Sequence, residues 1–156
     1  MKPDCSIIIL SYNRFHETTG PCLQSLFDDP ALSTEEIIVI DNCSQDSSPM
    51  YLKDVAKGRP NVRLVLNDVN HGFAGGNNIG ATLARNQILV FLNSDTRVPP
   101  GSITTLCSLL RKYPGWAMLG PVTNQAGNEQ KIPVQSNTPD LALEEGSRWV
   151  NHSDGD

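Results

Sequence analysis

The sequence predicts an α/β fold in which a mainly parallel sheet is flanked by helices. Four short runs rich in β-branched residues recur along the chain, at residues 6–10, 36–40, 62–66 and 87–92. These runs are nearly continuous in apolar residues, which is typical of strands covered on both faces. Segments of helical period separate them, and strand–helix alternation favours parallel strands joined by helical crossovers.

Helices are predicted between and after these strands. Each segment has apolar residues at helical spacing, as Leu23, Leu26 and Phe27 do in the first. The second helix follows "SQDSS", whose Ser and Asp suit an N-cap, and the fourth opens with Pro100, a residue favoured at the first helical position. The four predicted helices lie within residues 15–27, 47–57, 76–85 and 100–112.

The end of the chain differs from the rest. The run "WAMLGPV" at 116–122 is a candidate fifth strand. Beyond Asn124 the periodicity disappears, and Gly, Pro, Asn and acidic residues accumulate. We therefore predict two parts, an α/β core over residues 1–124 and a loop-rich acidic tail over residues 125–156.

Composition excludes several classes of protein. A chain of 156 residues fits one domain with a real core. Its net charge of −5 comes mostly from the segment that begins at Asp140, and the near-neutral remainder has no basic stripe for nucleic acid. The longest apolar runs have four or five residues, far below the roughly 18 that a membrane span needs, and the N-terminus lacks a signal peptide's features. The four scattered cysteines predict reduced thiols that pack in a cytoplasmic protein.

Polar residues follow all four predicted strands. The first strand runs into Ser11, Tyr12, Asn13 and Arg14, and the second into residues 41–46. The third leads to "NDVNHGFAGGNNIG" and the fourth to "NSD". Turns favour Asn, Asp and Ser, so polar residues after one strand need no further explanation. Polar residues after all four parallel strands predict a ligand site, because open α/β sheets bind ligands at the carboxyl ends of their strands.

The sequence lacks the common phosphate-binding loops. No GxGxxG follows the first strand, and no Gly-Lys-Ser/Thr occurs, so nicotinamide-cofactor and Walker-type sites are not expected. The glycines follow the third strand instead, as Gly72, Gly75, Gly76 and Gly80. They mark either a flexible loop that opens a helix or a place where the backbone approaches a ligand closely.

Four motifs carry a resemblance to a known family. "SIIILSYNR", "EIIVIDNCSQDSS", "NHGFAGGNNIGATLA" and "ILVFLNSDT" occur in the order and spacing of family-2 glycosyltransferases, which have the GT-A fold, a Rossmann-like nucleotide-sugar-binding half. The resemblance covers residues 5–122 and is strongest to the bacterial rhamnosyltransferase-like, cell-surface polysaccharide branch. It implies a nucleotide-sugar-binding core over residues 1–124 and the start of an acceptor-side region over 125–156, in a truncated catalytic domain.

The resemblance also implies an activity. Such an enzyme moves a sugar from a nucleotide-diphosphate donor to a glycan or lipid-linked acceptor, with inversion and with a divalent metal, in the cytoplasm or at the inner face of the membrane. Family members use an Asp-x-Asp motif for that metal, and this chain has Asn93-Ser94-Asp95, which keeps only the last carboxylate. Asp95 is therefore the predicted ligand of Mg²⁺ or Mn²⁺.

The remaining site residues are carried over in the same way. Asp41 matches the acid that accepts the nucleobase ring N–H, whereas Asp46 has an equally good explanation as an N-cap. His16 and His71 receive no role. The predicted donor-binding residues are Ser11, Tyr12, Asn13, Asp41, Ser44, Gly75, Asn77, Asn93 and Asp95.

No catalytic residue is predicted. An inverting transferase needs a general base, and in the family this acid lies beyond the "GPVTN" segment. Glu129, Glu144 and Glu145 follow that segment, but none lies in a recognisable motif. Two alternatives stay open: a donor-binding fragment without transferase activity, and a nucleotidyltransferase, which is expected to have a Gly-rich basic loop where this chain has only Arg14.

Overall fold

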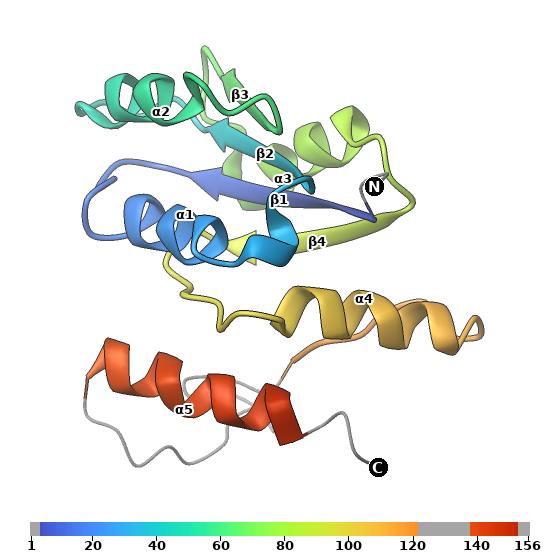
Figure 1. Cartoon of the computed structure of the whole chain (residues 1–156). Helices are drawn as coiled ribbons and strands as arrows, with labels where there is room; N and C mark the ends of the chain where they lie inside the picture. The colour runs from blue at the N-terminus through green and yellow to red at the C-terminus, as the bar shows by residue number, and fades with distance from the viewer. Residues whose placement is uncertain (1–3, 122–137, 153–156) are drawn as a thin grey trace. The chain divides into compact units, whose positions relative to one another are not determined.

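The computed structural model describes residues 4–121 and 138–152, and it confirms the predicted α/β fold (Figure 1). Four strands form one sheet in the order β3-β2-β1-β4, and every neighbouring pair is parallel. The strands are β1 (Cys5–Ser11), β2 (Glu36–Asp41), β3 (Val62–Leu66) and β4 (Ile88–Asn93).

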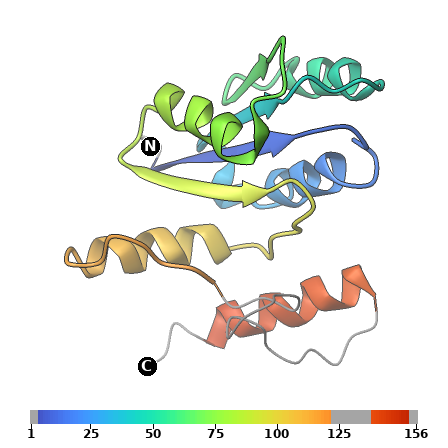
Figure 2. The ribbon, with the colours of Figure 1, turned by 180° about the vertical axis from the view of Figure 1, so that it is seen from behind.

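Helices cover both faces of this sheet. Helices α1 and α2 lie on one face and α3 on the other, as the two opposite views show (Figures 1 and 2). This is the arrangement expected of right-handed crossovers, because the chain runs from β1 to β3 in one direction and then returns past β1 to β4. The elements are α1 (Thr19–Phe27), the short 3₁₀ helix η1 (Pro30–Leu32), α2 (Ser48–Ala56) and α3 (Gly72–Leu83).

The core is centred on β1 and β2. Residues 7–9 and 37–40, all Ile or Val, are at most 1% exposed, which confirms that these two strands are covered on both faces. The same prediction is wrong for β3 and β4, whose residues are half-buried or exposed. The physical reason is their position, since both are edge strands of the described sheet.

The glycines of α3 fit close packing against the sheet. A side-chain carbon at Gly76 would overlap the side chain of Leu10, and one at Gly80 would overlap Ile8. At these two positions the close approach is therefore to β1 and not to a ligand. Gly72 differs, because its φ of +69° is the left-handed conformation that glycine adopts without strain.

The end of the chain departs from the prediction. Residues 116–121 do not form a strand, and residue 122 lies outside the described residues. Part of the predicted loop-rich tail is a helix, α5 (Pro139–His152). The residues at its start favour a helix, because Pro139 and Asp140 are residue types that suit the first turn. The first helical hydrogen bond runs from the Ala142 N–H to the carbonyl oxygen of Thr138 at 3.0 Å.

The chain forms two compact units, Met1–Thr96 and Arg97–Asp156. The first holds the sheet with α1 to α3, and the second holds α4 (Ser102–Lys112) and α5. The functional division at residue 124 stays a prediction. Within residues 4–121 and 138–152, no helix combines the length and the apolar character that crossing a membrane requires.

Candidate functional site

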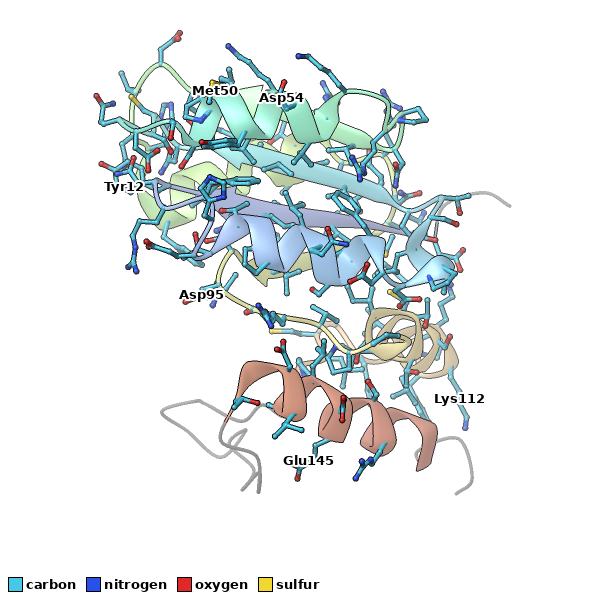
Figure 3. All side chains as sticks on the ribbon, turned by 60° about the vertical axis from the view of Figure 1, so that its left-hand side comes forward. Tyr12, Met50, Asp54, Asp95, Lys112 and Glu145 are labelled. Carbon is cyan, nitrogen blue, oxygen red and sulfur yellow. The ribbon has the colours of Figure 1, made fainter. Side chains whose placement is uncertain are left out.

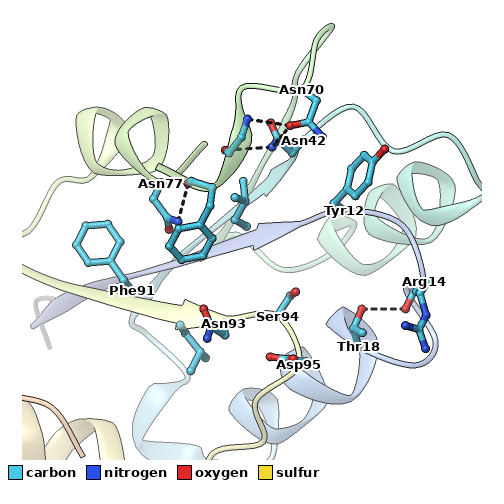
Figure 4. Close-up of a pocket in the computed structure, with 14 residues that line it drawn as sticks. Tyr12, Arg14, Thr18, Asn42, Asn70, Asn77, Phe91, Asn93, Ser94 and Asp95 are labelled. Atoms are coloured by element: carbon cyan, nitrogen blue, oxygen red, sulfur yellow. Dashed lines mark hydrogen bonds between the residues drawn. The ribbon is translucent and has the colours of Figure 1, made fainter. Parts of the chain in front are cut away.

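An open hollow of about 560 Å³ lies at the carboxyl edge of the sheet (Figure 4). It sits between the ends of β1 and β4, where the order of the strands reverses, and such switch points are the usual ligand sites of open α/β sheets. Its volume is in the range of small-molecule sites. The lining residues are Leu10, Tyr12, Arg14, Thr18, Asn42, Asn70, Gly72, Phe73, Asn77, Phe91, Leu92, Asn93, Ser94 and Asp95.

The tip of β4 supplies one wall of the hollow. Asn93, Ser94 and Asp95 all line it, and the side chains of Asn93 and Asp95 belong to exposed residues. Tyr12 and Asp95 lie at the same end of the sheet (Figure 3). The strand thus ends in polar residues at an opening of ligand size, with Asn93 and Asp95 exposed, and the ligand site that the sequence predicts here stays a prediction.

A buried thiol lies close to this wall. Cys22 of α1 donates to the carbonyl oxygen of Asn93 at 3.6 Å. Burial, and after it the negative charge of Asp95, raises the pKa of the Cys22 thiol to about 12, so the thiol is neutral at physiological pH. Cys22 therefore packs behind the hollow, as the sequence predicted for the cysteines.

The β4 tip suits a particular kind of metal site. Mg²⁺ and Mn²⁺ prefer oxygen ligands, keep several waters and are commonly bound by one or two carboxylates together with substrate phosphates. Asp95 offers a carboxylate and Asn93 an amide oxygen. In the part of the chain that the structure describes, no three His, Cys, Asp or Glu side chains cluster as a metal site. These residues fit an ion shared with a diphosphate better than one held by protein alone.

Asp41, at the tip of β2, is buried. It lies on the same sheet edge as the β4 tip, because β1 pairs Ser11 with Asp41 and Leu10 with Asn93. The residue is only 2% exposed, and it does not line the hollow. Its Oδ2 accepts from the Ser44 N–H at 3.0 Å and its Oδ1 from the Ser44 hydroxyl at 2.6 Å. In the structure, Asp41 therefore holds the turn after β2.

Asn42, which the sequence analysis did not single out, is the centre of a hydrogen-bond network. It is 3% exposed, and its Nδ2 donates to Asn70 Oδ1 at 2.9 Å and to the Gly72 carbonyl oxygen at 3.2 Å (Figure 4). Its Oδ1 accepts from Asn67 Nδ2 at 3.2 Å and from the His71 N–H at 3.0 Å. These four bonds fasten the β3–α3 loop to the tip of β2 and so shape one side of the hollow.

The other predicted donor-binding residues divide into two groups. Tyr12 and Asn77 line the hollow, with Tyr12 49% exposed and Asn77 Nδ2 donating to the Phe73 carbonyl oxygen at 2.9 Å. The rest do not line it, and side-chain hydrogen bonds within the protein engage four of these five. Besides the Asp41–Ser44 pair, Ser11 Oγ lies 2.8 Å from Thr19 Oγ1, and Asn13 Oδ1 accepts from the Gln45 N–H at 2.8 Å. The residues outside the lining are Ser11, Asn13, Asp41, Ser44 and Gly75.

Several lining residues carried no assignment from the sequence. Phe73 and Phe91 are 68% and 55% exposed and add apolar surface to the lining of the hollow. An apolar residue in a strand or helix usually signals core, so no local pattern distinguishes these two. Arg14 does stand at a strand tip, and that position is the one signal that pointed to it.

Comparison with known proteins agrees with the family that the motifs predicted. The sequence model described as "Glycosyl transferase family 2" matches residues 6–153. The succinoglycan biosynthesis protein ExoO of Rhizobium meliloti is 32% identical over 98 residues, which cover 63% of this chain and 27% of ExoO.

Solved structures show the same fold. Staphylococcus aureus TarS, residues 1–349, in complex with UDP matches with a TM-score of 0.61 and 21% identity over 72% of this chain. The mannosyltransferase PcManGT of Pyrobaculum calidifontis, in complex with GDP-Man and Mn²⁺, matches with a TM-score of 0.60 and 22% identity over 72% of this chain. The matched region spans about a third of each of these two solved chains (33%) and 27% of ExoO.

Proposed function

This chain belongs to glycosyl transferase family 2, and from that membership we propose that its hollow binds a nucleotide-diphosphate sugar for transfer to a glycan or lipid-linked acceptor. One observation carries the proposal. The hollow lies at the switch point between β1 and β4, and Asn93, Ser94 and Asp95 form one of its walls. The solved relatives TarS and PcManGT, which share the fold, were captured with UDP and with GDP-Man.

The lining offers groups suited to a nucleotide. Tyr12 presents a half-exposed ring on which a base can stack, and Asn77 and Asn70 present amides for ribose or phosphate oxygens. Asp41 remains a proposed contact to the nucleobase. Each carboxylate oxygen can accept more than one hydrogen bond, so the two bonds from Ser44 leave capacity for a third, although Asp41 is only 2% exposed.

We assign Mg²⁺ or Mn²⁺ to Asp95, with Asn93 contacting a metal-bound water or the donor ribose. When bound, the ion would offset the negative charge that develops on the departing diphosphate. The exposed carboxylate and amide of the β4 tip are the donor set that supports this assignment. The likeness to PcManGT, which was solved with Mn²⁺, adds support at the level of the fold.

The general base stays unassigned. An inverting transfer needs an acid that takes the proton of the acceptor hydroxyl. Glu129 lies outside the described residues, whereas Glu144 and Glu145 lie on α5 in the second compact unit. A donor-binding role without transfer is therefore the second candidate. We propose a cytoplasmic location, either free in the cytoplasm or at the inner face of the membrane.

Titration calorimetry tests the proposal. UDP, dTDP and GDP, each with Mn²⁺, are titrated into the wild type, into Tyr12→Ala and into Met50→Ala as a control at an exposed residue outside the hollow. We expect one nucleotide to bind, Tyr12→Ala to weaken it about tenfold through the lost stacking, and Met50→Ala to leave it unchanged. Binding of none of the three would contradict the proposal. Release of free sugar from the matching nucleotide sugar then distinguishes an enzyme from a binding module.

A further inference from the structure

Three successive backbone N–H groups of the β1–α1 loop are held by three alternate side chains, two from the β2–α2 loop and one from the first residue of α2. We call these three side chains, Ser44, Asp46 and Ser48, the clamp. The pairs are Asn13 N–H with Ser44 Oγ at 2.7 Å, Arg14 N–H with Asp46 Oδ2 at 2.8 Å and Phe15 N–H with Ser48 Oγ at 3.1 Å.

The clamped backbone has an unusual conformation. Asn13 and Arg14 both have φ of +56°, in the left-handed region that residues other than glycine rarely adopt. Two consecutive non-glycine residues keep such a conformation only when their surroundings hold them in it. The clamp supplies that hold, because it bonds the N–H of each of these residues and of the next one.

This conformation sets where three lining residues of the hollow lie. Tyr12 and Arg14 line it directly. The carbonyl oxygen of Arg14 also accepts from the Thr18 N–H at 3.0 Å and the Thr18 hydroxyl at 2.9 Å, so Thr18 is placed by the same loop. The clamp residues themselves do not line the hollow.

We propose that Asp46 is a positioning residue for nucleotide binding, which acts through the backbone of Arg14 to hold the Tyr12–Thr18 segment in its binding conformation. Asp46 is the central member of the clamp, and its second oxygen, Oδ1, accepts from the Ser48 N–H at 2.9 Å. One carboxylate therefore fastens the loop to the start of α2. The inference rests on the proposed nucleotide binding.

The charge of Asp46 strengthens this hold. Hydrogen bonds from the side chain of Ser48, then from the backbone N–H groups of Arg14 and Ser48, lower the pKa of Asp46 below its ordinary value. The group is thus ionised at neutral pH, and hydrogen bonds to an ionised acceptor are shorter and stronger than those to a neutral one.

The test measures nucleotide affinity for Asp46→Ala, Asp46→Asn and a matched control, Ser47→Ala. Ser47 is the N-cap residue directly before α2, and its side chain makes no cap hydrogen bond to that helix. Calorimetry uses UDP, dTDP and GDP with Mn²⁺. We expect Asp46→Ala to weaken binding about tenfold, Asp46→Asn to weaken it less because one acceptor oxygen remains, and Ser47→Ala to match the wild type. If Asp46→Ala does not fold, Asp46→Asn carries the test.

A cycle with Arg14→Ala separates positioning from mere stabilisation. This substitution keeps the backbone N–H that Asp46 binds but removes the side chain that reaches the hollow. If Asp46 positions that side chain, the loss caused by Asp46→Ala becomes smaller in the Arg14→Ala background. Unchanged affinity in folded Asp46→Ala while its melting temperature falls would overturn the inference alone, and additive losses would overturn the part of it that runs through the Arg14 side chain. No binding by the wild type would overturn the proposed function and this inference with it.

Discussion

The amino and carboxyl edges of the sheet both contain buried polar residues, but the two edges differ in how accessible their other polar side chains are. At the amino edge, buried Glu36 of β2 accepts from the Ser6 hydroxyl at 2.6 Å and from the Arg85 N–H at 2.9 Å. At the carboxyl edge, buried Asp41 of the same strand accepts two hydrogen bonds from Ser44. Both carboxylates therefore fasten loops, yet the hollow lies only at the carboxyl edge.

The difference lies in what surrounds each buried carboxylate. At the amino edge, Asn86 Nδ2 donates to the Cys5 carbonyl oxygen at 2.9 Å and to Ser6 Oγ at 3.1 Å, so the polar groups are bonded to one another. At the carboxyl edge, Asp41 and Asn42 are buried, but other polar side chains, above all Asn93 and Asp95, are exposed. Buried polar residues thus hold both edges in shape, and the exposed side chains make the carboxyl edge the candidate site.

The largest expected effect on stability is at the amino edge. Glu36→Ala leaves the Ser6 hydroxyl and the Arg85 N–H without their buried acceptor, so we expect the free energy of unfolding to fall by about 3 kcal/mol. Urea unfolding measures it, with Asp54→Ala, an exposed acid paired with Lys57, as the control. Nucleotide affinity of the folded variant should stay that of the wild type. A weakened nucleotide affinity would break the distinction between the two edges.

The next largest effect concerns the packing behind the hollow. Gly76→Ala forces a methyl group into the side chain of Leu10, and overpacking of this kind costs about 1–3 kcal/mol. Gly115→Ala is the control, because a side-chain carbon there meets nothing within 4 Å. Thermal unfolding of both variants gives the comparison. Equal melting temperatures would show that α3 moves away from β1 at no cost.

Asp41→Asn is expected to affect both stability and binding. Asparagine has one acceptor oxygen where aspartate has two, so one of the two bonds from Ser44 is lost, at about 1 kcal/mol of stability. If Asp41 also accepts the nucleobase N–H, affinity falls ten- to a hundredfold, since hydrogen bonds to charged groups contribute about 1.5–3 kcal/mol. Calorimetry with Asp54→Asn as the control decides. A loss of stability with unchanged affinity would leave Asp41 a purely structural residue.

Asp95→Ala should have the smallest effect on stability and a selective effect on binding. An exposed residue after a strand end contributes little to the core, so we expect a change within about 0.5 kcal/mol. If the ion is shared with the diphosphate, metal and nucleotide bind synergistically in the wild type, and the coupling is reciprocal. Affinity measured with Mn²⁺ and with a chelator should differ for the wild type but not for Asp95→Ala. Equal wild-type affinities in both conditions would contradict the metal assignment.

The fold was predictable because its signals are local. Continuous apolar runs such as residues 37–40 identify buried strands, and polar residues after each run identify the edge that carries the hollow. Helix α5 was missed, although Thr138, Pro139 and Asp140 form an ordinary helix start, because the composition around them is that of a loop.

The details of the site were less predictable because they depend on hydrogen bonds between distant segments. The sequence does not reveal that Asn42 bonds the β3–α3 loop, or that Asp46 bonds the backbone of Arg14. Nor does it reveal that Asp41 faces Ser44 and not the hollow. Whether a polar side chain after a strand is buried or exposed is decided by the loops that pack over it.

Nuclear magnetic resonance of the amide groups tests the central claim most directly, because both edges of the sheet are observed in one titration. UDP, dTDP and GDP, each with Mg²⁺ as a diamagnetic ion, are added to the labelled wild type. The account predicts that one of them shifts amides of the carboxyl edge, at Tyr12, Asn42, Asn77 and residues 93–95, while those of Glu36 and Asn86 stay in place. Shifts centred on the amino edge, or no shifts with any nucleotide, would contradict it.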